Sequence, residues 1–181
     1  MDVNVWVAYG LYLAWLVAGT GDFLCHRVTD LPHTSGVAES ALHLLQLILL
    51  GSGMVLAMAF ETTPLISLVL ILLVMAHAAA GYVDTRTAFV RRRVILPIEQ
   101  HLHSVLDMAP IVALASLLIA TWPAAIDGGW HATLRTPALP WELWCAVLLP
   151  ATLLCIVPAL LELRAAVTAS GRADFRQRRS P

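Results

Sequence analysis

Long apolar runs alternate with short polar stretches along the whole chain. Five of these runs reach the roughly 20 residues that an α-helix needs to cross the hydrocarbon core of a bilayer. They cover residues 4–25, 37–60, 65–84, 97–122 and 140–163. The pattern therefore predicts an all-α, polytopic membrane protein with five transmembrane helices, of which helices 1–4 form a four-helix bundle.

The composition agrees with this pattern. The chain has 181 residues, of which 59% are hydrophobic and 13% are charged. A water-soluble domain of this size is about half apolar and about a quarter charged. No internal repeat or second domain interrupts the apolar runs. We therefore expect one transmembrane domain over residues 1–168 and a basic cytoplasmic tail over residues 169–181.

Arginine is distributed unevenly between the two sides of the predicted bundle. The loop after the first run, the region after the third run and the C-terminal tail together carry ten arginines, whereas the opposite side carries only Arg135. Loops rich in Lys and Arg stay in the cytoplasm. This asymmetry predicts an N-terminus outside and a C-terminus in the cytoplasm, as in a bacterial inner-membrane protein. The net charge of −1 gives no indication of a nucleic-acid partner.

Histidines and acids gather at the predicted cytoplasmic ends of the first four helices. Residues four or seven positions apart share a helix face, because one turn takes 3.6 residues. The pairs and triplets with this spacing are Asp22 and His26, Glu39 and His43, His77 and Asp84, and Glu99, His103 and Asp107. His101 points about 200° away from Glu99 at 100° per residue, so it is expected to face elsewhere.

Such a cluster is costly inside a bilayer unless its charges are neutralised. An unpaired carboxylate at that depth costs several kcal/mol, and neighbouring carboxylates repel each other. Divalent metal ions remove both problems, and carboxylate and imidazole ligands suit Fe, Mn and Zn. The predicted ligands are Asp22, His26, Glu39, His43, His77, Asp84, Glu99 and His103. Glu99 and Asp107 are also the candidate catalytic groups, and Gln46, Arg86, Gln100 and Asp107 are expected to support the ligands.

The kind and placement of these ligands resemble those of ferritin-like dinuclear carboxylate proteins and of integral-membrane di-iron oxygenases, hydroxylases and desaturases. The resemblance covers about residues 20–110. The stretches "ESALH" and "EQHLH" space Glu and His by four, whereas ferritin-like proteins use Glu-x-x-His, and the histidine boxes of desaturases are absent. The resemblance implies two divalent ions, iron first, with zinc or manganese as alternatives. It also implies an O₂-dependent oxidoreductase, a lipid-soluble substrate and an electron donor.

Other functions fit the same residues. One alternative is a zinc-dependent membrane hydrolase in which a carboxylate activates a metal-bound water. Metal transport or sensing, haem binding by facing histidines such as His43 and His77, and a metal-free network of ion pairs are further alternatives. Arg91, Arg92 and Arg93 are expected to anchor the chain at the membrane surface, with gripping of an anionic substrate as a second possibility. Glu162, at the inner end of the fifth run, is given no catalytic role.

Overall fold

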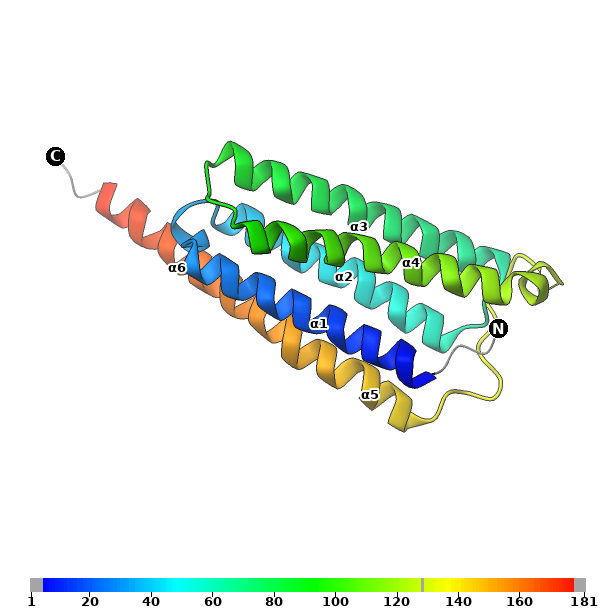
Figure 1. Ribbon diagram of the computed structural model, residues 1–181. Helices are drawn as coiled ribbons and strands as arrows, with labels where there is room; N and C mark the ends of the chain where they lie inside the picture. The colour runs from blue at the N-terminus through cyan, green and yellow to red at the C-terminus, as the bar shows by residue number, and fades with distance from the viewer. Residues whose placement is uncertain (1–4, 128, 178–181) are drawn as a thin grey trace.

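The computed structural model describes residues 5–127 and 129–177 (Figure 1). Within these residues the regular structure is entirely helical. The main helices are α1 (Val5–Val28), α2 (Val37–Ala59), α3 (Pro64–Val90), α4 (Pro97–Asp127), α5 (Trp141–Ala151) and α6 (Val157–Gln177). A 3₁₀ turn, η1 (Leu31–His33), lies between α1 and α2, and a π-helical turn, η2 (Thr152–Ile156), joins α5 to α6.

Five helical segments are long and apolar enough to cross a membrane. The first four correspond to α1, α2, α3 and most of α4, and the fifth is the continuous helix formed by α5, η2 and α6. Large apolar side chains lie exposed along these segments, whereas Asp22, His26, Glu39 and Glu99 are buried. This arrangement inverts that of a water-soluble protein and suits a bundle surrounded by lipid. The predicted fold class and its five spans are confirmed.

Helices α1–α4 pack against one another as expected. Helix α3 packs against α2 and α4, and α1 packs against α4. Helix α6 packs against both α1 and α2, so the fifth span closes the side of the bundle between them. The α1–α2 and α3–α4 connections and helix α6 lie at the same end of the molecule (Figure 1). The helix continues beyond residue 168, where we expected the tail to begin, as far as Gln177.

Local sequence fixes where two of these helices begin. Helix α3 starts at Pro64, and the Thr63 side chain accepts a hydrogen bond from the Ile66 N–H. Helix α4 starts at Pro97, and Glu99 Oε2 accepts from the Leu96 N–H at 3.2 Å. Proline and a side-chain acceptor both favour a helix N-terminus. Glu99 is therefore held in place by the backbone of its own helix.

Candidate metal centre

A buried cluster of imidazoles and carboxylates lies at the end of the bundle that holds the α1–α2 and α3–α4 connections. Seven of the eight predicted ligands meet there in groups whose ligand atoms lie within 4.8 Å of one another. These seven are Asp22, His26, Glu39, His43, Asp84, Glu99 and His103, and all are buried. Helical spacing thus predicted correctly which faces of the four helices turn inward.

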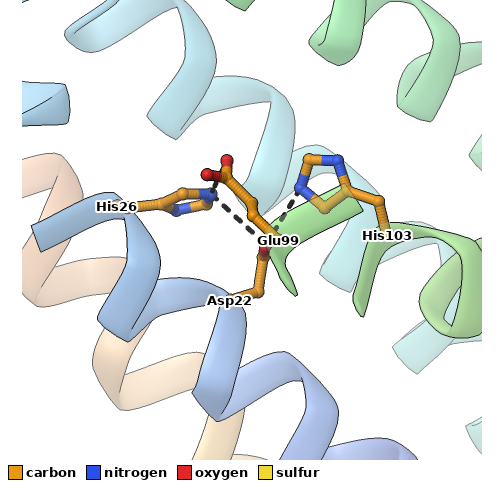
Figure 2. Close-up of side chains that lie close together, drawn as sticks. All are labelled: Asp22, His26, Glu99 and His103. Atoms are coloured by element: carbon orange, nitrogen blue, oxygen red, sulfur yellow. Dashed lines mark ion pairs between the residues drawn. The ribbon is translucent and has the colours of Figure 1, made fainter. Parts of the chain in front are cut away.

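The first group joins α1 to α4. Figure 2 shows Asp22 and His26 on α1 facing Glu99 and His103 on α4. The Nε2 atom of His26 lies 3.3 Å from Asp22 Oδ2 and 3.6 Å from Glu99 Oε1. The Nε2 atom of His103 lies 3.0 Å from Asp22 Oδ1. All four side chains therefore converge on one small volume.

The second group joins α2 to α3. It consists of Glu39, His43 and Asp84. The Nε2 atom of His43 lies 3.2 Å from Asp84 Oδ2. The two groups are adjacent, because the imidazole rings of His26 and His43 stack with centroids 4.5 Å apart and planes inclined by 7°.

Glu162 on α6 connects the two groups, although its sequence position had given it no predicted role in the site. Its Oε2 accepts a hydrogen bond from His26 Nδ1 and its Oε1 accepts one from His43 Nδ1, both at 2.8 Å. A carboxylate that holds Nδ1–H fixes the imidazole tautomer and leaves the Nε2 lone pair free for a metal ion. An acid within an apolar run, even at its end as here, favours a buried partner or a functional site.

The contact distances fall into two classes. The contacts of Glu162 with its two histidines measure 2.8 Å and are ordinary hydrogen bonds. Around Asp22, the Nε2–carboxylate distances are 3.0–3.6 Å, and neither imidazole Nε2 forms a hydrogen bond of acceptable geometry within the described chain. Two ligands that are each about 2.1 Å from one ion and about 90–110° apart around it are separated by about 3.0–3.4 Å. The distances from Asp22 to His26 and His103, 3.3 and 3.0 Å, fall in this range, whereas the 3.6 Å between His26 and Glu99 lies slightly above it.

Arg93 is buried beside the cluster. The prediction that it anchors the chain at the membrane surface was therefore wrong for this residue. Its guanidinium donates to Glu39 Oε2 at 3.1 Å, approaches Glu39 Oε1 at 2.6 Å, and also donates to Glu99 Oε1 and to the Thr29 hydroxyl. Burial by itself would lower the pKa of Arg93, but the hydrogen bonds to Glu99 and Glu39 hold that pKa above its ordinary value. Arg91 and Arg92 are exposed, as an anchor requires.

A cavity of about 70 Å³ adjoins the cluster. It is lined on one side by Asp22, His43, Asp84 and His103, and further along by Gln46, His77 and Asp107. His77 is buried but lies outside both groups and outside the set of His26, His43 and Glu162 that connects them in the described chain. His77, the eighth predicted ligand, therefore lies at the cavity wall, two turns along α3 from Asp84.

Two of the predicted supporting residues point away from the cluster. Arg86 and Gln100 are exposed, and neither has an ion pair or a side-chain hydrogen bond within the described chain. Arg86 follows Asp84 by two positions and Gln100 follows Glu99 by one, so at 100° per residue both leave the buried face. His101 is exposed as well, which confirms the direction expected from its spacing.

Comparisons of this chain with protein-family models, with curated proteins and with solved structures found no match.

Proposed function

We propose that the protein is a membrane-embedded oxidoreductase with a dinuclear metal centre, most simply di-iron, that uses O₂ to oxidise a lipid-soluble substrate. The observation that carries the proposal is the buried cluster itself. It contains five carboxylates, from Asp22, Glu39, Asp84, Glu99 and Glu162, and one permanently charged cation, Arg93.

The charge of this cluster favours divalent ions. With neutral imidazoles, five carboxylates and one guanidinium leave a large negative excess in a region of low dielectric constant. Two divalent ions would cancel it, and carboxylate and imidazole are ligands that iron accepts. Facing helices that each contribute a carboxylate and an imidazole are also how helical bundles build di-iron sites.

The groups divide naturally between two ions. Asp22, His26, Glu99 and His103 would hold one ion, and Glu39, His43 and Asp84 would hold the other. Glu162 would orient the imidazoles of His26 and His43 without binding metal itself. Arg93 would offset part of the charge of Glu39 and Glu99, so that these carboxylates can share one small volume.

The metal pair would supply O₂ binding and activation. In a hydroxylation, one oxygen atom enters a C–H bond and the other leaves as water. This requires two electrons and two protons besides O₂. The electrons would come from a one-electron redox protein that docks at the cytoplasmic end, and the protons would come from solvent. A desaturation would use the same inputs and remove two hydrogen atoms.

The proposed orientation rests on the arginine asymmetry. In the sequence, the predicted cytoplasmic segments carry ten arginines and the opposite side carries only Arg135, which favours a bacterial inner-membrane protein with its N-terminus outside and its C-terminus in the cytoplasm. The cluster would then lie at the cytoplasmic end of the bundle. A lipid-soluble substrate would reach it from the bilayer.

Haem binding and metal transport fit the geometry less well. Both nitrogens of His43 already contact carboxylates, and the adjoining cavity of about 70 Å³ is far below the roughly 300–1,000 Å³ of pockets for large ligands. Within the described chain, every group of potential ligands lies at one end of the bundle, whereas transport requires a path through it.

The proposal is tested with protein purified in lipid nanodiscs, loaded anaerobically with ⁵⁷Fe(II) and then exposed to O₂. We expect Mössbauer and optical spectra of a coupled ferric pair, together with O₂ uptake that depends on the iron. Stoichiometric zinc in the purified protein and the absence of any iron-dependent O₂ chemistry would contradict the proposal and favour a zinc hydrolase, whose activity would persist without O₂.

A further inference from the structure

The cavity beside the cluster has a polar wall that no ligand group uses. Gln46 lies one helical turn from His43 on α2, and Asp107 lies one turn from His103 on α4. Neither side chain has a hydrogen bond within the described chain. Both line the cavity of about 70 Å³ that also touches the ligand groups.

Gly81 on α3 leaves room for an oxygen atom of each of these two side chains beside its backbone. A Cβ atom at position 81 would lie 2.8 Å from Asp107 Oδ1 and 3.6 Å from Gln46 Oε1. The carboxylate and the amide therefore approach the backbone of α3 from two neighbouring helices. Any side chain at position 81 would push the Asp107 carboxylate aside.

Two further residues that line the cavity each carry a buried polar atom without a partner in the described chain. The Nδ1 atom of His77 and the Nε1 atom of Trp15 are buried and have no hydrogen-bond partner within the described chain, and His77 is only 3% exposed. Leaving such a group unpaired costs about 1–3 kcal/mol. These atoms are best explained as partners for something that enters the cavity.

We propose that this cavity binds the hydroxyl-bearing end of a lipid-soluble substrate, with the hydroxyl group held between Gln46 and Asp107. A hydroxyl both donates and accepts hydrogen bonds, so it can donate to the Asp107 carboxylate and accept from the Gln46 amide. A carbonyl or an ether oxygen could only accept. This inference rests on the proposed function for the reaction and adds the class of substrate.

The size of the cavity limits what can enter. One water needs about 10–15 Å³ of such volume, so about 70 Å³ holds a group of only a few heavy atoms. Only one end of a long lipid-soluble substrate can therefore enter the cavity. One helical turn of about 5.4 Å separates the polar wall from His43 and His103. The carbon that bears the hydroxyl, or its neighbour, would lie beside the ligand groups and would be the carbon that is oxidised.

The test uses a 12-carbon primary alcohol that carries a photoreactive diazirine near its hydroxyl end, with its methyl ether as the matched probe. The full-length protein in nanodiscs is irradiated with each probe, and labelled peptides are identified by mass spectrometry. We expect the alcohol to label peptides that contain Gln46 or Gly81, and the ether to label them about tenfold less. Excess 1-dodecanol should suppress the labelling, whereas dodecane should not.

Two variants address the polar wall without touching a proposed ligand. Gln46→Leu removes the amide, and Gly81→Ala displaces the Asp107 carboxylate, so each should reduce labelling by the alcohol about tenfold. Gly53→Ala is the control, because its Cβ would make ordinary 3.7 Å contacts with Leu70 and Leu73. Gln46→Leu keeps the test independent of any repacking at position 81.

The outcomes separate this inference from the proposed function when metal content is measured on the same samples. Equal labelling by the alcohol and the ether, or labelling that neither variant reduces, would overturn the hydroxyl site even in a protein that is full of metal. Alcohol-dependent labelling of a protein that binds no metal would support the hydroxyl site and contradict the proposed metal-dependent oxidoreductase.

Discussion

Glu162 joins two imidazoles that come from different helices. It accepts the Nδ1–H of His26 and of His43, whose rings stack in parallel, and it turns both Nε2 atoms toward carboxylates. Outer carboxylates of this kind set the orientation and basicity of metal-binding histidines. One residue on the fifth span thereby controls the ligands of both proposed ions.

Replacing Glu162 with Gln should weaken metal binding without unfolding the protein. An amide has one acceptor oxygen and cannot hold two imidazole N–H groups equally, so we expect a 10- to 100-fold loss of metal affinity. Competition with a chromophoric chelator measures this loss. Glu142→Gln, at an exposed acid early in the same span, is the control. Equal affinities in the two variants would contradict the role assigned to Glu162.

Arg93 should matter more for stability than its neighbours Arg91 and Arg92. Arg93→Leu would leave the buried carboxylates of Glu39 and Glu99 without their cation, which typically costs about 3–5 kcal/mol. Thermal unfolding in detergent should show a large fall in Tm for this variant. Arg91→Leu changes an exposed residue of the same run and should change stability by about 0.5 kcal/mol or less. A similar Tm for both variants would contradict the buried ion pairs.

At the scale of a helix, the buried face of α4 carries two of the proposed ligands. Glu99 and His103 are buried, four residues apart, and His101 between them is exposed. The same relation holds on α1 for Asp22 and His26, and on α2 for Glu39 and His43. A side chain on these helices therefore reaches the cluster only if it has the correct angular position.

Substitutions along α4 should follow this periodicity. His103→Ala should lower metal affinity at least tenfold, because it removes a ligand of the first group, whereas His101→Ala should leave affinity unchanged. Metal retained after dialysis against a chelator measures the difference. Equal losses in both variants would show that the cluster depends on general packing at this end of α4 rather than on its inward face.

Helical spacing could predict the faces of α1–α4, but it could not predict Glu162 or Arg93. The π-helical turn η2 inserts extra residues per turn, so the angular position of Glu162 does not follow from residues before Thr152. Arg93 lies in the connection between α3 and α4, where no period applies, and its burial depends on acids from two distant helices. The exposed positions of Arg86 and Gln100 did follow from 100° per residue, and the prediction neglected that angle.

At the scale of the whole molecule, five apolar helices surround an interior whose largest fully buried side chains include His26, Glu39 and Glu99. The exterior exposes apolar side chains that suit lipid, whereas one end of the interior holds buried carboxylates and imidazoles. The fifth span contributes both packing and Glu162, so the cluster requires all five helices. This concentration of charge at one end is the property that the proposed function explains.

The central claim is tested most directly by the metal content of protein purified without chelators. Inductively coupled plasma mass spectrometry should find about two divalent metal ions per chain, chiefly iron. His43→Ala and Glu99→Ala should each lose at least one of them, whereas His101→Ala should lose none. A wild-type protein without bound metal, or full metal content in both ligand variants, would contradict the account.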